Sequence, residues 1–406
     1  MIRSVSRGLT AMTLAAAVAA TTMGTAFAGP SMQPELDAVH EAGIPGVHAQ
    51  VRDGAEKWGG AAGVADLETN RPMEPHMRHR VGSITKTFVA TALLQQVGKG
   101  TVGLHDPIAK HVPELVPGEL GQQVTVRMLL NHTSGIGDYF GALYPSVAEG
   151  SLEDVEANRY RSWSPQELVA IGLDQPRTGE PGERYSYSNT GYIIAGEILG
   201  KVSGVPAEQY VTDNVIRPLG LRNTYFPGEA PTIAGPHGKA YDPLYGIPEQ
   251  QGEFSVYNMT MAGTAGALVS TPADLNVFYR ELLAGGLLAP ELLAEMKDGV
   301  PVLDENGNEY ARYGLGIMGV DGQGCGWVWG HSGGVHGMET MSLHTEDASR
   351  QISFGTNIRH YQELGEDGRP KPHPADDAIM HLSVQGVCPE SPEAARILPK
   401  IQHSGL

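Results

Sequence analysis

Strand-like segments lie at both ends of this 406-residue chain, and a long helical stretch separates them. Near the N-terminus, residues 47–51 and 60–65 are rich in β-formers and small residues, with the turn signal Asp53-Gly54 between them. Near the C-terminus, four more runs of β-formers lie at residues 313–320, 327–329, 338–343 and 351–356. Because a strand must bury its apolar face against another element, we expect the two ends of the chain to share one sheet.

The middle of the chain, residues 104–226, has a helical pattern instead. Its apolar residues recur in helical pieces bounded by proline and capping residues, notably at 126–131, 165–172 and 192–202. Beyond this region, Thr271 is a good N-cap and Pro272 a good first residue for a further helix at 275–283.

These patterns predict an α/β fold of the α+β kind, an antiparallel sheet flanked by helices. Residues 29–103 and 227–388 would form the sheet-and-helix domain, and residues 104–226 an inserted, mainly helical region. A cleft between the two parts is the default place for an active site.

Residues 1–28 have the composition of a cleavable export signal. Arg3 and Arg7 precede an apolar and small-residue run at 9–20, and residues 26–28 have the small-residue pattern of a cleavage site. The run is interrupted and too short to span a membrane, and no later stretch replaces it. We therefore expect a secreted protein without a membrane anchor.

The net charge argues against some partners. It is −18 at pH 7, and removing the two arginines of the export signal takes it to −18 − 2 = −20. Such a surface repels nucleic acid and anionic lipid. The last residues, 389–406, are rich in proline, serine and charge, and we expect them to form a loose tail.

Cys325 and Cys388 are the only cysteines. Outside the cell an even pair is expected to form one disulfide. Two cysteines are too few for a structural zinc site, and His76 and His79 lack partners in the sequence, so we expect neither a metal nor another cofactor.

The only Ser-x-x-Lys of the chain opens an apolar helical pattern and joins Ser83 to Lys86. Residues three apart share one face of a helix, so this spacing places a nucleophile beside a base. Gly82 suits a tight turn before the helix, which is expected to end at Gly98 or Gly100. The serine would then lie at the positive end of the helix.

Two later motifs could share a site with this pair. Tyr187 and Asn189 lie two residues apart on a loop before a helix, so their side chains can reach one place. The third motif follows the apolar strand at 327–329 and reads His331-Ser332-Gly333-Gly334. Glycines there would let a substrate backbone lie close against the strand edge.

In this order, the three motifs resemble those of the serine penicillin-recognising enzymes, which are DD-peptidases, class C β-lactamases and their esterase relatives. The resemblance covers residues 35–388 and includes stretches at 104–107, 124–135, 181–182, 218–221 and 271–275. His331 in the third motif, the export signal and the length most resemble the secreted soluble D-alanyl-D-alanine carboxypeptidases. The resemblance implies a β-lactamase/transpeptidase-like fold.

The resemblance also implies a serine-type acyl hydrolase that works through an acyl-enzyme on Ser83. Its partners would be small-molecule or peptide substrates containing D-amino acids, with β-lactams as inhibitors or substrates. Backbone N–H groups of Ser83 and Gly334 would stabilise the oxyanion. Either Lys86 or Tyr187 could remove the serine proton, and the sequence leaves this choice open.

Other implied roles concern the substrate. Asn189 would position the substrate amide, while His331 and Ser332 would complete the proton network to the leaving group. His331 is expected to be neutral over much of the physiological pH range.

Three positions depart from the pattern of the carboxypeptidases. Where those enzymes hold a substrate carboxylate with a hydroxyl residue and an arginine, this chain has Gly334 and Met318, and Met261 replaces a cleft tryptophan. A buried carboxylate without donors is costly, so the acylation machinery is expected to act on an altered substrate. An esterase, a D-aminopeptidase, a β-lactamase, and a β-lactam- or peptide-binding protein without turnover are the alternatives.

Overall fold

The computed structural model describes residues 31–149, 151–245, 252–304, 306–322, 324–366 and 368–390. The export signal predicted at residues 1–28 lies outside these ranges, as does all of the predicted tail except its first two residues. Within the described ranges, no helix is both long enough and apolar enough to cross a membrane.

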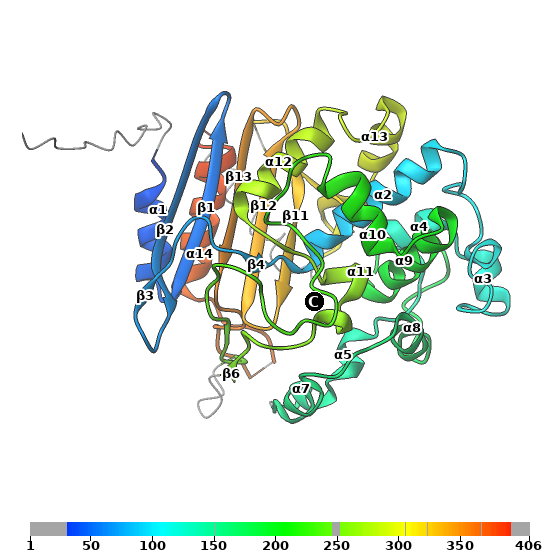
Figure 1. Ribbon diagram of the computed structural model, residues 1–406, viewed down its shortest axis with the longest axis horizontal. Helices are drawn as coiled ribbons and strands as arrows, with labels where there is room; N and C mark the ends of the chain where they lie inside the picture. The colour runs from blue at the N-terminus through cyan, green and yellow to red at the C-terminus, as the bar shows by residue number, and fades with distance from the viewer. Residues whose placement is uncertain are drawn as a thin grey trace, which may run out of the picture.

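A nine-stranded antiparallel sheet forms the centre of the fold (Figure 1). Its order is β3-β2-β1-β13-β12-β11-β10-β9-β8. The strands are β1 (Gly46–Asp53), β2 (Glu56–Asp66), β3 (Arg71–Pro72), β8 (Val300–Leu303), β9 (Glu309–Tyr313), β10 (Met318–Asp321), β11 (Trp327–Val335), β12 (Met338–Thr345) and β13 (Arg350–Thr356). The N-terminal β1 pairs with the C-terminal β13, with Val47 opposite Thr356, which confirms the predicted fold class.

The single strand predicted at 313–320 is wrong. Tyr313 ends β9 and Met318 begins β10, and a tight turn separates them. Gly316 has φ +75° in this turn, and the Gly314 N–H donates to the Ile317 carbonyl over 2.8 Å. Glycine takes a positive φ at little cost, so the chain reverses there and forms two strands.

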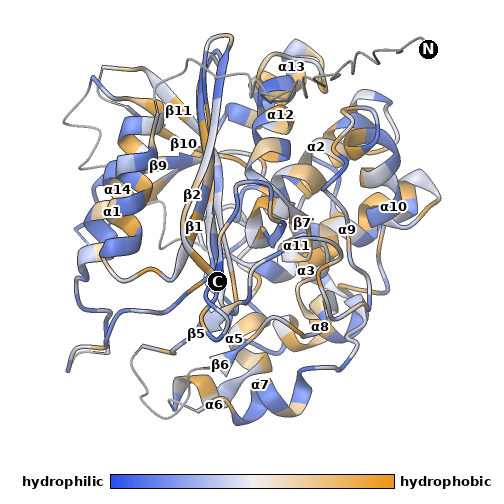
Figure 2. Cartoon of the chain, turned by 60° about the vertical axis from the view of Figure 1, so that its left-hand side comes forward, coloured by the Kyte–Doolittle hydropathy of each residue, from blue (hydrophilic) through white to orange (hydrophobic). Residues whose placement is uncertain are grey.

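Helices cover both faces of the sheet (Figures 1 and 2). On one face lie α1 (Gln33–Glu41) and α14 (Pro374–Val387), which contact each other and the strands β2 and β13. On the other lies α12 (Pro272–Leu283), whose first turn is capped by the side chain of Thr271, as predicted. Neither α1 nor α14 was predicted from the sequence.

The helical region fills the right-hand side of Figure 1. Between residues 104 and 226 its α-helices are α3 (Glu119–Gln123), α4 (Val126–Leu130), α5 (Phe140–Leu143), α6 (Pro145–Ala148), α7 (Glu153–Asn158), α8 (Pro165–Leu173), α9 (Asn189–Ser203) and α10 (Ala207–Val211). Further along the chain lie α11 (Gly263–Gly266) and α13 (Pro290–Lys297), with the short strand pairs β4 (His79–Arg80) with β7 (Val269–Ser270), and β5 (Tyr241–Asp242) with β6 (Gly252–Glu253).

The helix α2 (Thr85–Gly98) lies between the sheet and this helical region and contacts α9, α10 and α11. Residues 85–94 are all buried, including the polar ones. A helix that is buried all round belongs to the core. Its first turn is therefore held rigidly, and that turn is preceded by the 3₁₀ turn Gly82–Ile84, which carries Ser83.

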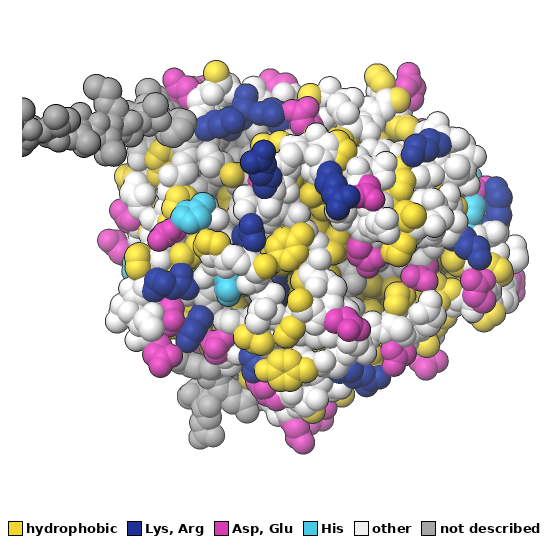
Figure 3. Space-filling view, viewed as in Figure 1, with side chains coloured by type: hydrophobic (Ala, Val, Ile, Leu, Met, Phe, Trp, Pro, Cys, Tyr) yellow, Lys and Arg dark blue, Asp and Glu magenta, His cyan; other side chains and the backbone are white. Residues whose placement is uncertain are grey.

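Two surface features complete the fold. Cys325 and Cys388 are joined by a disulfide, which ties the segment before β11 to the end of α14. On the face shown in Figure 3, basic side chains are interspersed among acidic ones, although the whole chain is strongly acidic.

Candidate active site

The turn that carries Ser83 packs backbone to backbone against β11. A Cβ on Gly82, which has φ +53°, would lie 2.6 Å from the Gly334 nitrogen, and a Cβ on Gly333 would lie 1.9 Å from the Val81 carbonyl oxygen. Only glycine allows this approach. The glycines of β11 were expected to let a substrate backbone lie close, but the space beside Gly333 is filled by the nucleophile turn of the protein itself.

This packing places two backbone N–H groups at the nucleophile. The Gly333 Cβ position lies 2.9 Å from the Ser83 nitrogen, and the Gly82 Cβ position lies 2.6 Å from the Gly334 nitrogen. The strand β10 pairs with residues 327–330 of β11 and not with residues 331–335. The arrangement suits an oxyanion hole made by the N–H groups of Ser83 and Gly334.

The structure brings the side chains of Ser83, Lys86 and Tyr187 together. Ser83 Oγ lies 2.8 Å from Lys86 Nζ and 2.7 Å from the Tyr187 hydroxyl. Ser83 and Lys86 are fully buried, and Tyr187 is half-buried. A serine hydroxyl within hydrogen-bond distance of an amine and a phenol has the geometry of an activated nucleophile.

Burial favours the neutral form of the Lys86 amine. Burial lowers its pKa well below the usual 10.5, and the nearby Asp138 offsets only part of this shift. Its amine lies 2.7 Å from the side-chain oxygen of Asn189 and 2.8 Å from the Ala265 carbonyl, which both accept. A neutral amine has two N–H groups and one lone pair. In the neutral form, an amine that donates both N–H groups to these oxygens keeps its lone pair for the proton of Ser83.

Tyr187 is held as a phenol. Burial raises its pKa, and the carboxylate of Asp138 adds to the rise, while the hydrogen bond with Ser83 and the charge of Arg359 oppose it. A phenol donates its proton, so Tyr187 donates to Ser83 Oγ in the free protein. Between the two bases that the sequence left open, burial favours Lys86, because it favours a neutral amine and a neutral phenol.

Asn189 connects Lys86 to a carboxylate that was not predicted from the sequence. Its Nδ2 donates to Asp138 Oδ2 over 2.9 Å, which turns its oxygen toward Lys86. Asp138 is half-buried and also accepts from the Phe140 N–H over 3.0 Å. Burial raises the pKa of its carboxyl group, and the hydrogen bond from Phe140 and the charge of Lys86 oppose the rise. Its position three residues after the family-like stretch 124–135 was the only available signal.

The side chain of His331 forms hydrogen bonds with Ser332 and Tyr313. Its Nδ1 faces the Ser332 carbonyl, which can only accept, so Nδ1 carries the proton and Nε2 accepts from the Tyr313 hydroxyl over 2.7 Å. Burial, with the adjacent Lys86, lowers the pKa of the imidazole to about 3, so it is neutral. Both ring nitrogens are thus used away from Ser83, and a role for His331 and Ser332 in protonating the leaving group stays a prediction.

A second histidine, His132, was missed. Its ring centroid lies 4.2 Å from that of Tyr187, and its Nδ1 accepts from the Ser188 N–H over 3.2 Å. The residue has φ +59° and is buried, and burial lowers the pKa of its imidazole well below the usual value. His132 therefore supports the ring of Tyr187 as a neutral packing partner.

The positions that depart from the carboxypeptidase pattern offer no donor at the nucleophile. Met318 is buried in the apolar cluster beneath α1 and α14, and Met261 is buried in the larger cluster of the helical side. Beside Gly334, however, lies a cation that was not predicted. A Cβ on Gly334 would be 2.6 Å from the guanidinium carbon of Arg359.

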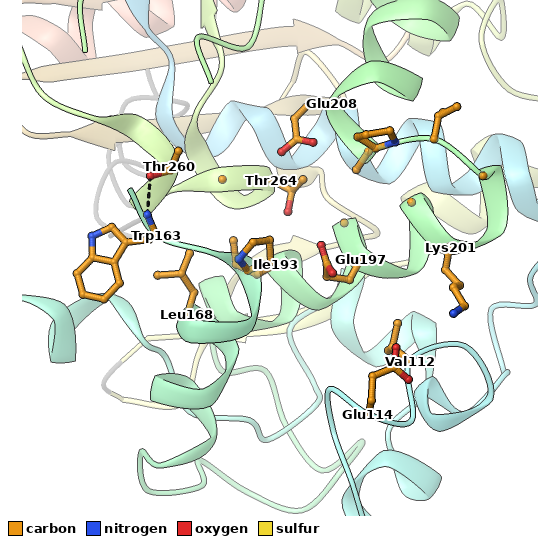
Figure 4. Close-up of a pocket in the computed structure, with 18 residues that line it drawn as sticks. Val112, Glu114, Trp163, Leu168, Ile193, Glu197, Lys201, Glu208, Thr260 and Thr264 are labelled. Carbon is orange, nitrogen blue, oxygen red and sulfur yellow. Dashed lines mark hydrogen bonds between the residues drawn. The ribbon is translucent and has the colours of Figure 1, made fainter. Parts of the chain in front are cut away.

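A large cavity lies elsewhere, along the side of α9 (Figure 4). It measures about 690 Å³, and Glu197, Lys201 and Trp163 line it together with Glu114 and Glu208. None of its lining residues belongs to the Ser83 cluster.

Among the described residues, no group of three or more His, Cys, Asp or Glu side chains is placed to hold a metal ion.

Comparisons with known proteins identify the family to which this chain belongs. The family model described as Beta-lactamase matches residues 31–366. The chain is 27% identical over 308 residues to penicillin-binding protein 4* of Bacillus subtilis, covering 73% of this chain and 64%, less than two thirds, of that relative.

Two solved structures are also similar. A D-stereospecific amidohydrolase from Streptomyces sp. is 35% identical, with a TM-score of 0.77, covering 89% of this chain and 100% of that one. A D-amino acid amidase from Ochrobactrum anthropi SV3, complexed with L-phenylalanine amide, is 28% identical, with a TM-score of 0.68, covering 80% of this chain and 90% of the other.

Proposed function

Because this chain belongs to the Beta-lactamase family of serine acyl hydrolases, we propose that it cleaves D-amino-acid amides and short peptides that begin with a D-residue, through an acyl-enzyme on Ser83. The two similar solved structures, a D-stereospecific amidohydrolase and a D-amino acid amidase, support this substrate class. The site supports it independently.

The observation that carries the proposal is the carboxylate of Asp138. It is linked through Asn189 to Lys86, whose amine touches Ser83. In an amino-acid amide, the α-ammonium is only two bonds from the carbonyl carbon that Ser83 attacks. A half-buried carboxylate that only the side chains of Asn189 and Lys86 link to the nucleophile is therefore suited to bind that ammonium. Such a charged hydrogen bond contributes about 1.5–3 kcal/mol.

The reaction follows from the hydrogen bonds. Ser83 Oγ attacks the amide carbonyl while its proton passes to the lone pair of Lys86, and the carbonyl oxygen becomes an anion facing the N–H groups of Ser83 and Gly334. The carbon–nitrogen bond then breaks. The leaving amine takes a proton from Tyr187, and the proton that Lys86 accepted from Ser83 restores the phenol. Water finally cleaves the ester and frees the D-amino acid.

Steady-state kinetics with matched substrates test the proposal. The substrates are D-phenylalanine amide, L-phenylalanine amide and N-acetyl-D-phenylalanine amide, with Ser83→Ala as the inactive control. We expect the free D-amide to have the highest kcat/KM. In Asp138→Asn, the preference for the free amine over the acetylated one should fall by about 10- to 100-fold. Equal turnover of both D-amides by the wild type, or turnover of esters alone, would contradict the proposal.

The D-alanyl-D-alanine carboxypeptidase activity expected from the sequence is the second candidate. It is supported by the relative named penicillin-binding protein 4* and by residues 331–335 of β11, which do not pair with β10, so that an extended peptide can pair with them there. Release of D-alanine from diacetyl-L-lysyl-D-alanyl-D-alanine measures it. Covalent labelling of Ser83 by a fluorescent penicillin tests whether β-lactams enter the same site.

We also propose that the protein is exported. The charge and composition of residues 1–28 support this. N-terminal sequencing of protein recovered from the culture medium is expected to begin near Gly29, and a chain retained in the cell with residues 1–28 intact would contradict export.

A further inference from the structure

A second pocket lies beside the catalytic cluster, at Arg359. It measures about 430 Å³, which is in the range that binds small ligands. Three aromatic side chains, two histidines and one arginine provide most of its chemistry: Phe140, Tyr144, Tyr245, His336, Arg359 and His360. These residues come from α5 and from segments that follow β5, β11 and β13.

The pocket borders the site already described. The guanidinium carbon of Arg359 lies 2.6 Å from the position of a Cβ on Gly334, and the nitrogen of that glycine lies 2.6 Å from the position of a Cβ on Gly82 in the nucleophile turn. Phe140 lines the pocket with its ring, while its N–H donates to Asp138. The charge of Arg359 also lowers the pKa of the Tyr187 phenol. A group that leaves from Ser83 on the Tyr187 side therefore lies next to this pocket.

His336 provides a second, independent observation. It is only 6% exposed, and among the described residues its Nε2 has no hydrogen-bond partner. Its Nδ1 faces the buried carboxylate of Asp242 at 3.7 Å, and that carboxylate is bound more closely by His360. A buried polar nitrogen without a partner costs free energy, which a ligand can recover. His336 thus has one polar atom available to whatever fills the pocket.

We propose that this pocket binds the leaving group of a peptide substrate, namely an amino acid with an aromatic or large apolar side chain and a free carboxylate. The carboxylate would bind to Arg359 and His336, and the side chain would pack against Phe140, Tyr144 and Tyr245. This cation takes the place of the donors that are missing at Gly334 and Met318. The proposal rests on the proposed function, and it narrows the peptide substrates to D-aminoacyl dipeptides.

The test compares one dipeptide with and without its terminal charge. The substrates are D-alanyl-D-phenylalanine and its C-terminal amide, and the readout is the ratio of their kcat/KM values. Because both substrates share the same scissile bond, a general loss of activity cancels in this ratio. We expect Arg359→Met to lower the ratio by about 10- to 100-fold and Arg359→Lys to restore part of it. An unchanged ratio in Arg359→Met would overturn the proposal.

Control variants separate charge from side-chain packing. Arg312→Met removes an exposed arginine that pairs with Glu309, and it should leave the ratio as in the wild type. Tyr144→Ala should reduce the preference for D-alanyl-D-phenylalanine over D-alanylglycine, and an unchanged preference would remove the apolar part of the proposal.

If Arg359→Met does not fold, acyl transfer by the wild type gives the same answer. With D-alanine methyl ester as the acyl donor, free D-phenylalanine should be at least 10-fold more effective as the acceptor amine than phenethylamine, which lacks the carboxylate, and equal transfer to both amines would overturn the proposal. A wild-type protein that hydrolyses no D-aminoacyl substrate contradicts the proposed function itself. Turnover of these substrates with an unchanged ratio in Arg359→Met contradicts the leaving-group pocket alone.

Discussion

Replacing Lys86 by methionine tests how Ser83 becomes reactive. Methionine is apolar and close to lysine in length, so it removes the amine and changes the packing little. The change deletes three hydrogen bonds, to Ser83, Asn189 and the Ala265 carbonyl. Two buried oxygens are then left without their donor, at about 1–3 kcal/mol each. Methionine also removes a fully buried amine, whose desolvation is costly. We expect a net loss of about 1–3 kcal/mol in the free energy of unfolding.

The effect on catalysis should be much larger than the effect on stability. Loss of a positioned general base costs about 10²- to 10⁴-fold in rate. The pre-steady-state rate of Ser83 acylation by a D-phenylalanine ester measures this step directly. Lys99→Met is the matched control, because Lys99 lies exposed at the end of the same helix. Its amine donates a hydrogen bond to the hydroxyl of Tyr210 and lies over the ring of that residue. It should acylate at the wild-type rate.

The pH profile provides a second readout of the same claim. Burial lowers the pKa of Lys86, so the base is present above that lowered pKa and is lost as the pH falls through it. The acylation rate of the wild type should therefore reach its plateau well below pH 10.5, and the acid limb assigned to Lys86 should vanish in Lys86→Met. Acylation within 10-fold of the wild-type rate in Lys86→Met, or a wild-type rate that rises steadily to pH 10.5, would refute a neutral lysine base.

Three further predictions concern the fold around the site. Replacing Cys325 and Cys388 by serine opens a loop with a sequence separation of 63, so the free energy of unfolding in urea should fall by about 4 kcal/mol, and an unchanged midpoint would contradict this. Burial lowers the pKa of His48 from 6.5 to about 4, so His48 alone should cost the fold about 3 kcal/mol as the pH falls from 7 to 4. His48→Gln should lose less over the same interval, and an equal loss would exclude His48 as the cause. Gly333→Ala places a Cβ 1.9 Å from a backbone carbonyl and should lower kcat/KM by more than about 100-fold, whereas Gly200→Ala, which meets only ordinary contacts, should not.

The sheet could be predicted because its strands carry local signals. Turn residues such as Asp53-Gly54 separate runs of β-formers, and only pairing between the two ends of the chain buries their apolar faces. The edge strand β8 was missed, because it is short and contains Pro301, which a strand pattern disfavours. The helices α1 and α14 were missed for lack of a strong repeat.

The candidate site was only partly predictable. The contact between Ser83 and Lys86 follows from helical spacing, but Asp138 and Arg359 reach the site through tertiary packing, and no local pattern marks them. The general base could not be predicted from the sequence either, because the pKa values of Lys86 and Tyr187 depend on their burial in the folded protein.

One measurement tests the central claim most directly. The protein is mixed with D-phenylalanine methyl ester, quenched in acid during turnover, and mapped by peptide mass spectrometry. We predict one D-phenylalanyl group per chain, on the peptide that contains Ser83, and no such group in Ser83→Ala. Steady turnover without an adduct, an adduct on another residue, or full activity of Ser83→Ala would contradict the account.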